Sequence, residues 1–474
     1  MKKVYSLLLA GLIGVLSAGC DKSFLELAPI SNSNASNFYK TQADFDLAVS
    51  AAYATLYVFY HPQGPVSYFS EQMSDNATIY NINGIQADKK AFKDFNLNSS
   101  NSQVYTFWQQ CYRSLFNVNI VLDKIEDANI DAAYKERIKG EMRFLRALYY
   151  FNMVQMWGDL PLVTKALTAE ESYAVLRSPQ ADVYRQIVED LNSAIAALPA
   201  KSAITVAGHA SKGAAQSLLG KVYLTQGNKA AATQVLTEVV NSGQYSLLPQ
   251  YSSLWIVTNK NTAESIFEIQ FKGGASGVPL SDYYNEYSPY ENFSFTLYAG
   301  GMNQVTDDLY NEFEAGDARR DITIAPGYTN KTGTFIAIKY PRKWTDANAP
   351  IINSREASSN NFMVLRYADV LLMLAEASGS ATYLNEVRAR AGVPLFGSAG
   401  YPAATYPTLD LAIEHERRVE LAIEFQRGFD LRRTNRAVPV LTTKGKSVNA
   451  DKLLLPIPEI VRQQNSAITQ NRGY

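Results

Sequence analysis

Two stretches of the sequence combine aromatic rings with carboxylate and amide side chains. The first contains Asp75, Asn76, Tyr80, Asn81 and Asn83. The second has seven aromatic residues in sixteen positions, Tyr283, Tyr284, Tyr287, Tyr290, Phe293, Phe295 and Tyr298, and Trp344 follows further along the chain. Sugars present flat C–H faces and many hydroxyl groups, which exposed rings flanked by polar side chains can bind. We therefore predict a ligand site formed by Asp75, Asn76, Tyr80, Asn81, Tyr283, Tyr284, Tyr287, Tyr290 and Trp344. The rings of the second stretch are expected to be exposed as a group, and the alternative is that several of them pack a long loop onto its neighbours.

Residues that could carry out catalysis are few. The three histidines, His61, His209 and His415, are far apart, and the sequence has no metalloprotease, serine-hydrolase or phosphate-loop motif. Glu416, Glu420 and Glu424 recur at every fourth position, but arginines interleaved at matched helical spacings favour ion pairs over acid–base chemistry. We predict that the protein is not an enzyme, that it needs no cofactor and that none of these residues forms a metal site, and the sequence leaves open whether a structural metal ion is bound. A glycoside hydrolase, which needs only Asp75 and one carboxylate of the second stretch, remains a less favoured alternative.

The overall charge argues against nucleic acid as a partner. Lys plus Arg number 44 and Asp plus Glu number 45, so no broad positive field is available to hold a polyanion. After Cys20, no uncharged apolar run approaches the roughly 18 residues that a membrane-spanning helix needs.

The start of the chain predicts export. Lys2 and Lys3 precede an apolar run at residues 4–18, which is too short to span a bilayer. The run closes at Leu16-Ser17-Ala18-Gly19-Cys20, which resembles a bacterial lipoprotein processing site. This resemblance implies that residues 1–19 are removed and that acyl chains on Cys20 anchor the protein to a membrane. Secretion with a free Cys20 is the alternative. With Cys20 acylated, Cys111 is left as a single thiol, so no internal disulfide is expected.

Apolar periodicity predicts that most of the chain is helical. Helices are expected at residues 45–57, 137–157, 181–198, 211–226, 229–241, 366–377, 381–391 and 409–427. Leu219-Gly220-x-x-Tyr223, followed by Ala230 and Ala231, resembles the signature of a tetratricopeptide helix pair, in which glycine lets two helices approach closely. Alternation at residues 265–271 predicts a strand, and residues 335–340 are a second candidate. The irregular stretches 60–102 and 245–361 are where a binding site is expected.

Several segments occur together in the order in which one protein family carries them. They are Phe24-Leu25-Glu26, Glu141-x-Arg143-Phe144-Leu145-Arg146-Ala147-x-Tyr149-Tyr150-Phe151, Trp157-Gly158-Asp159-Leu160-Pro161, Leu365-Arg366-Tyr367-Ala368-Asp369, Glu416-Arg417-Arg418-x-Glu420-Leu421 and Gln470-Asn471-x-Gly473-Tyr474. With these segments the chain resembles the SusD/RagB family of outer-membrane nutrient-binding lipoproteins over nearly its whole length after Cys20. The resemblance implies a scaffold of tetratricopeptide-like helix pairs on the cell surface.

The resemblance also sets the expected organisation and role. We expect a lipoprotein signal at 1–19, a SusD-like helical part at 20–244, and a C-terminal part at 245–474 whose loop-rich region, 245–361, contributes to the ligand site. The implied function is capture of oligosaccharide or polysaccharide and its delivery to a SusC-like TonB-dependent transporter in the outer membrane. A pure adaptor, in which helix pairs grip a partner protein and no small ligand binds, is the alternative from another class.

Overall fold

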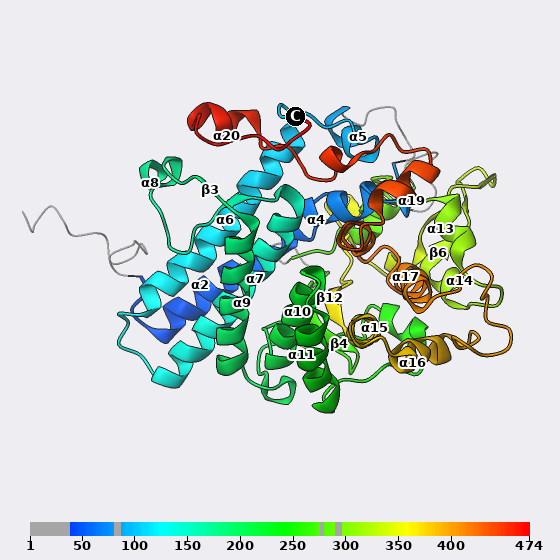
Figure 1. Ribbon diagram of the computed structural model, residues 1–474, viewed down its shortest axis with the longest axis horizontal. Coiled ribbons are helices and arrows are strands. Elements are labelled where there is room, and N and C mark those ends of the chain that lie inside the picture. Colours follow the sequence, from blue (N-terminus) through cyan, green and yellow to red (C-terminus); the bar gives the residue numbers. More distant parts are fainter. Residues whose placement is uncertain (1–37, 80–86, 275–278, 290–295) are drawn as a thin grey trace, which may run out of the picture.

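Long α-helices form the scaffold of the computed structural model, which describes residues 38–79, 87–274, 279–289 and 296–474 (Figure 1). They are α2 (Gln42–Ala54), α6 (Ser102–Ile125), α7 (Ala132–Trp157), α9 (Gln180–Ala197), α10 (Lys212–Thr225), α11 (Lys229–Asn241), α15 (Tyr367–Ser378), α16 (Ala381–Ala391) and α17 (Leu409–Glu420). From α6 to α17, helices that follow one another in this order pack side by side. This is the arrangement of a helical repeat scaffold. Within the described ranges, no helix has both the length and the apolar character needed to cross a membrane.

Local sequence signals set the ends of these helices. The Asp131 side chain accepts a hydrogen bond from the Tyr134 N–H at the start of α7, and the helix ends at Gly158, whose φ of 74° few other residues adopt. The bounds predicted for α11 and α16 agree with the structure at both ends. Caps and periodicity act within a few residues, so they can be read from the sequence.

Helices α10 and α11 form the close pair that the tetratricopeptide-like motif predicts. Gly220 faces Leu236 across the pair, and a Cβ atom at position 220 would collide with the Leu236 side chain. The glycine is therefore required for the distance between the two helices, and the interpretation of the motif is confirmed.

The predicted helix at 409–427 is wrong beyond Glu420, where α17 ends. Ile423 and Phe425 have φ values of 57° and 62°, a left-handed conformation that breaks the helix. The Phe425 N–H donates to Glu71 Oε1 at 2.8 Å, and the Phe425 ring stacks on Phe362 with ring centres 4.7 Å apart. Contacts with distant parts of the chain thus hold this turn, and a new helix, α18 (Arg427–Arg433), follows it.

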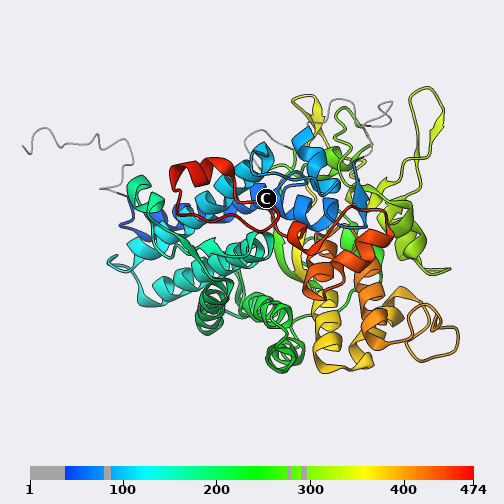
Figure 2. The ribbon, with the colours of Figure 1, turned by 45° about the horizontal axis from the view of Figure 1, so that its top comes forward.

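Shorter elements fill the space between the long helices. The short helices are α3 (Leu56–Phe59), α4 (Pro65–Ser67), the π-helix η2 (Tyr68–Gln72), α5 (Ala87–Lys93), α8 (Ala169–Tyr173), α12 (Tyr283–Tyr287), α13 (Asp307–Glu312), α14 (Arg319–Thr323), α19 (Ala437–Thr443) and α20 (Glu459–Gln464), with 3₁₀ turns η3 (Lys201–Ala203), η4 (Tyr251–Trp255), η5 (Arg342–Trp344) and η6 (Ala450–Lys452). In Figure 2, much of the loop-rich segment between α11 and α15, coloured light green to yellow, lies at the upper right, whereas α10, α11, α15 and α16 lie at the bottom.

The described strands pair in twos, and all of the pairs are antiparallel. The longest pair is β4 (Ser265–Ile269) with β12 (Phe362–Arg366), in which Phe362 is opposite Ile269. The others are β1 (Ala77–Thr78) with β5 (Gln304–Val305), β2 (Leu160–Pro161) with β3 (Arg177–Ser178), β6 (Ile324–Ala325) with β9 (Tyr340–Pro341), β7 (Tyr328–Thr329) with β8 (Phe335–Ile336), and β10 (Ile351–Ile352) with β11 (Arg355–Glu356). The strand predicted at 265–271 is thus confirmed, whereas 335–340 holds β8 and the first residue of β9, which belong to different pairs.

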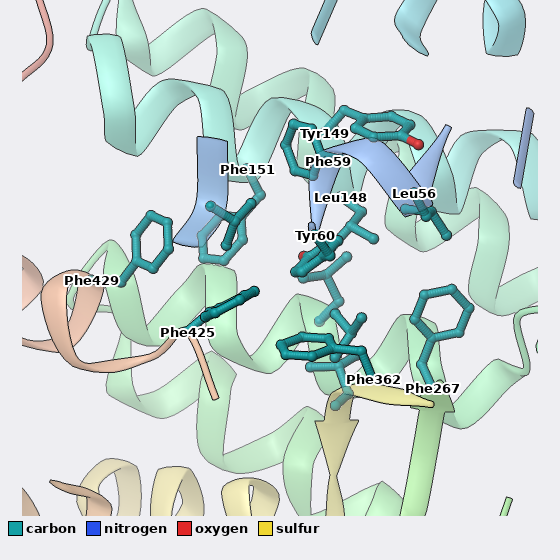
Figure 3. Close-up of a cluster of buried hydrophobic side chains, with 14 of the residues drawn as sticks. Leu56, Phe59, Tyr60, Leu148, Tyr149, Phe151, Phe267, Phe362, Phe425 and Phe429 are labelled. Atoms are coloured by element: carbon teal, nitrogen blue, oxygen red, sulfur yellow. The ribbon is translucent and has the colours of Figure 1, made fainter. Parts of the chain in front are cut away.

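An aromatic core joins the helical scaffold to the β4–β12 pair (Figure 3). Phe59 meets Tyr149 of α7 edge to face at 4.9 Å, and Tyr60 contacts Phe362 of β12 at 5.5 Å. All four rings are almost completely buried. Such packing fixes the position of the loop-rich region relative to the helices.

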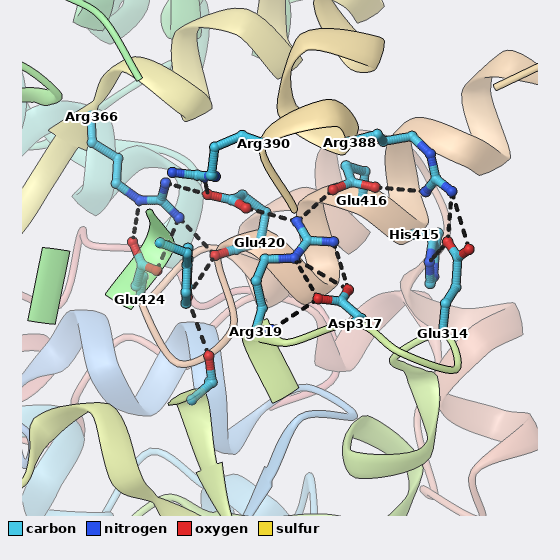
Figure 4. Close-up of polar contacts among 12 residues, drawn as sticks. Glu314, Asp317, Arg319, Arg366, Arg388, Arg390, His415, Glu416, Glu420 and Glu424 are labelled. Carbon is cyan, nitrogen blue, oxygen red and sulfur yellow. Dashed lines mark hydrogen bonds and ion pairs between the residues drawn. The ribbon is translucent and has the colours of Figure 1, made fainter. Parts of the chain in front are cut away.

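The stripe of carboxylates Glu416, Glu420 and Glu424, the first two on α17 and the third just after it, forms buried ion pairs (Figure 4). Glu420 accepts from Arg319 at 2.7 Å and from Arg366 at 2.6 Å, and also from Arg390. Burial raises the pKa of Glu420, but the guanidinium groups of Arg390, Arg366 and Arg319 outweigh it and hold the pKa well below its ordinary value. A carboxylate held ionised in this way cannot serve as a general acid near neutral pH, and the structural interpretation of the stripe is confirmed.

Candidate ligand-binding surface

Four of the predicted ligand-binding rings are buried, so the expectation that they are exposed is wrong. Tyr283, Tyr287 and Trp344 are at most 1% exposed and Tyr284 is 7% exposed. Tyr283 stacks on Trp344 and Phe362, with ring centres 4.6 Å and 5.3 Å apart, and its hydroxyl donates to the Tyr60 carbonyl. Tyr283 and Tyr287 lie one turn apart on α12, so both face the core. The alternative, that rings pack the loop onto its neighbours, holds for these four.

Asp75 and Asn76 are also buried, at 3% and 1% exposed. Both Asp75 oxygens accept from Arg427, at 2.8 Å and 2.9 Å, and Asn76 Oδ1 accepts from Arg418 Nε at 3.0 Å. Burial raises the pKa of Asp75, but Arg427 and Arg418 outweigh it and keep the pKa well below the ordinary value. Asp75 is therefore unsuited to the general-acid role that a glycoside hydrolase requires.

The remaining predicted residues, Tyr80, Asn81, Tyr290 and Cys20, lie outside the described residues. Their roles in ligand binding and lipid attachment stay predictions.

The structure instead brings together a polar and aromatic cluster that we call the Tyr298–Arg355 surface. It comprises His61, Gln63, Lys89, Asp282, Glu286, Tyr298 and Arg355. These residues come from the two irregular stretches, 60–102 and 245–361, that the sequence assigns to a binding site. Lys89, Asp282 and Tyr298 each follow closely on one of the three internal stretches outside the described ranges.

An exposed ring held by an arginine forms one half of this surface. Tyr298 is 39% exposed, and the Arg355 guanidinium lies over its ring, 4.9 Å from the ring centre. Asp282 fixes Arg355 through a contact of 3.3 Å and also accepts from His61 Nε2 at 3.1 Å. The ring is thus held in place before any ligand arrives, which reduces the entropy lost on binding.

A chain of hydrogen bonds forms the other half. Lys89 Nζ donates to Gln63 Oε1 at 2.6 Å, and Gln63 Nε2 donates to Glu286 Oε2 at 2.6 Å. Burial raises the pKa of Glu286, although the bond from Gln63 and the nearby His61 oppose it. Glu286 is buried and holds Gln63 in place, whereas Gln63 and Lys89 are half-buried. An ammonium and an amide beside an exposed ring match what a sugar's hydroxyl groups and C–H faces require.

Sequence reasoning missed most of this surface. Tyr298 stood out in the aromatic stretch, but Gln63, Lys89, Asp282 and Arg355 carry no motif. The available signal was their position, since all four lie within the two irregular stretches.

Two family models match the chain on either side of its middle. One, described as "Starch-binding associating with outer membrane", matches residues 23–224, and the other, "SusD family", matches residues 323–474. A SusD-like protein P2 of Formosa agariphila is 28% identical, with 96% of this chain and 97% of the relative covered. A SusD-like protein of Bacteroides ovatus is 26% identical, with 90% and 81% covered. The chain belongs to the SusD/RagB family.

Solved structures agree with this assignment. A laminarin-binding SusD-like protein superposes with a TM-score of 0.77 at 29% identity, covering 92% of this chain and 100% of that protein. Surface glycan-binding protein A from Bacteroides thetaiotaomicron, solved with laminarihexaose, gives a TM-score of 0.77 at 22% identity, covering 91% and 100%, and supports the fold alone. The predicted family and mostly helical fold are confirmed, and the family is one of binding proteins without catalytic activity.

Proposed function

We propose that this protein is a cell-surface lipoprotein that captures oligosaccharide or polysaccharide and delivers it to a SusC-like TonB-dependent transporter. The observation that carries the proposal is the similarity to a laminarin-binding SusD-like protein over 92% of the chain. The Tyr298–Arg355 surface supports it, because it pairs an exposed ring with fixed donors and acceptors. Laminarin is therefore the first ligand to test.

The binding part of the proposal can be tested by affinity electrophoresis. The mature chain, residues 20–474, with Cys20→Ala to prevent acylation, would be run through gels containing laminarin, starch or other polysaccharides. We expect retardation by at least one glycan and loss of about two- to twelvefold in affinity for Tyr298→Ala, since an aromatic stacking contact contributes about 0.5–1.5 kcal/mol. Tyr173→Ala is the matched control, because Tyr173 is 51% exposed and belongs to α8, outside the Tyr298–Arg355 surface.

Each other outcome has a defined meaning. Unchanged retardation of Tyr298→Ala would place the glycan site elsewhere. No retardation by any glycan would favour the adaptor, and release of reducing ends would favour a glycoside hydrolase.

The location and the partner need separate experiments. With Cys20 acylated, the mature protein should fractionate with outer membranes, and Cys20→Ala should leave that fraction. The transporter should copurify with the protein after mild detergent extraction. An unmodified Cys20 in protein from its native cells would refute the lipid anchor.

A further inference from the structure

A second, strongly charged cavity lies outside the Tyr298–Arg355 surface. It has a volume of about 250 Å³ and is bounded by α17, α19, the start of α18, the end of α13 and the loop that holds Tyr406. Its charged lining residues are Asp75, Glu312, Glu414, His415, Arg418, Arg427, Arg436 and Lys444. Small-molecule sites begin at about 300 Å³, so the space suits a compact ligand.

The floor of the cavity is rigid and internally neutralised. Arg427 holds both oxygens of Asp75, and Arg418 donates to Glu312 Oε2 at 2.7 Å. The Tyr406 hydroxyl donates to the other Glu312 oxygen at 2.9 Å. These groups form ion pairs and hydrogen bonds with one another, so the floor of the cavity consists of fixed polar groups whose charges neutralise one another.

The rim carries two cations that are each ion-paired with a carboxylate and remain partly open to solvent. The Arg436 side chain is 41% exposed and uses Nε to donate to Glu414 Oε2 at 2.8 Å. Among the residues that the structure describes, neither terminal nitrogen of Arg436 has a hydrogen-bond partner. Lys444 is 37% exposed, and its ion-pair partner within the described ranges is Asp308, which is itself 32% exposed. The rim therefore keeps unused N–H groups beside the cavity.

These groups define the chemistry of a ligand. The two terminal nitrogens of a guanidinium match the two oxygens of a carboxylate, and an ammonium adds a second positive charge. Leu411 and Val440 supply an apolar part of the wall, against which the C–H face of a small ring can pack.

We propose that this cavity is a second ligand site, which binds the carboxylate of a uronate, as a free sugar acid or as the end of a chain. Arg436 receives the carboxylate in bidentate fashion, Lys444 adds the second contact, and the sugar ring lies against Leu411 and Val440. The site is independent of neutral-glycan capture at the Tyr298–Arg355 surface.

Isothermal titration calorimetry tests the proposal with the mature chain carrying Cys20→Ala. We expect D-galacturonate to bind and D-galactose, which lacks the carboxylate, to bind at least tenfold more weakly. Trigalacturonate distinguishes a chain end from a free sugar acid, and affinity for either one supports the site. The double variant Arg436→Gln/Lys444→Gln should lose at least tenfold in galacturonate affinity.

A second double variant, Arg185→Gln/Arg472→Gln, is the control for net charge. It removes the same charge from side chains that are 66% and 88% exposed and do not line the cavity, so it should keep the affinity. Arg436→Lys keeps the charge but loses the bidentate geometry, and it should weaken binding even where the Gln variant does not fold.

Three results would overturn the proposal. They are equal affinity for galacturonate and galactose, unchanged affinity in the Arg436 variants, and inorganic sulfate binding as tightly as galacturonate, which would indicate an anion site without sugar selectivity. Tyr298→Ala should leave galacturonate affinity unchanged, so failure at one site is distinguishable from failure at the other.

Discussion

Comparing alanine substitutions at two tyrosines, one buried and one exposed, provides the sharpest test of the revised site. Tyr283 was predicted from the sequence to contact ligand but lies in the core, whereas Tyr298 is exposed and held by Arg355. Replacing each by alanine should therefore produce opposite effects. Tyr283→Ala should lower stability, and Tyr298→Ala should lower glycan affinity.

The magnitude for Tyr283→Ala follows from its surroundings. The ring is completely buried and stacks on both Trp344 and Phe362, and truncation of a buried aromatic side chain costs about 3–5 kcal/mol. The Tyr60 carbonyl also loses the bond from the Tyr283 hydroxyl, which adds about 1 kcal/mol or more. We expect the free energy of unfolding to fall by about 4–6 kcal/mol. Tyr283→Phe, which removes only the hydroxyl, should cost about 1–2 kcal/mol.

Tyr298→Ala should behave differently. The variant loses one cation–π contact at the surface, so its free energy of unfolding should fall by no more than about 1 kcal/mol. Its affinity for laminarin, or for whichever glycan retards the parent protein, should fall by about two- to twelvefold. Denaturant unfolding followed by circular dichroism measures the first quantity, and calorimetric titration measures the second. A Tyr283→Ala protein that unfolds like the parent but binds glycan more weakly would refute the reasoning, since it would return Tyr283 to the ligand site.

Three further substitutions test the scaffold. Glu420→Gln removes a buried carboxylate shared by three arginines, so it should lower the free energy of unfolding, measured with denaturant, by about 3–5 kcal/mol. Glu136→Gln breaks an exposed ion pair and should lower it by no more than about 1 kcal/mol. Similar losses in the two variants would contradict the stabilising role of the buried network. Burial raises the pKa of Glu71 to about 7 from 4.5, so its contribution to stability is complete below pH 4.5 and falls by about 3 kcal/mol as the pH rises through 7. Glu71→Gln cannot ionise, so its free energy of unfolding should rise relative to that of the parent protein between pH 5 and pH 8. An equal difference in stability between the two proteins at both pH values would argue against the raised pKa of Glu71. Gly220→Ala should cost about 1–3 kcal/mol because the new methyl group collides with Leu236, and an unchanged unfolding midpoint would show that α10 and α11 can separate freely.

The sequence predicted most of the long helices because their signals are local, but it missed α6, which was not among the predicted helices. The apolar stripe of α7, its stop at Gly158 and the bounds of α16 depend on residues within a few turns of one another. The break after α17 could not be predicted in this way. The break depends on a hydrogen bond from the Phe425 N–H to Glu71, which lies 354 residues earlier in the sequence. The charge pattern of the helix also continues past the break, so it gives no sign of the end of α17.

The ligand site was harder to predict for a related reason. A high density of tyrosine indicates apolar area that must be covered, but it does not indicate whether protein or ligand covers it. The partners that bury Tyr283, namely Phe362 and Trp344, lie more than sixty positions away in the sequence. Arg355, which holds the exposed Tyr298, lies 57 positions further along the loop-rich region, so only the fold brings the two together.

Buried ion pairs attach this loop-rich region to the helical scaffold. No disulfide contributes to this attachment among the described residues, because the cysteine that they include, Cys111, is free and buried. Glu424 next to α17 binds Lys343 at 2.7 Å and Arg366 at 2.7 Å, on either side of Arg355 in the sequence. An unpaired charge in such a place costs several kcal/mol, so a shift of the loops that separated these partners would be strongly opposed. The same charges that resemble a catalytic stripe in the sequence therefore fix the position of the loops around Arg355, and a preformed binding surface requires such fixed loops.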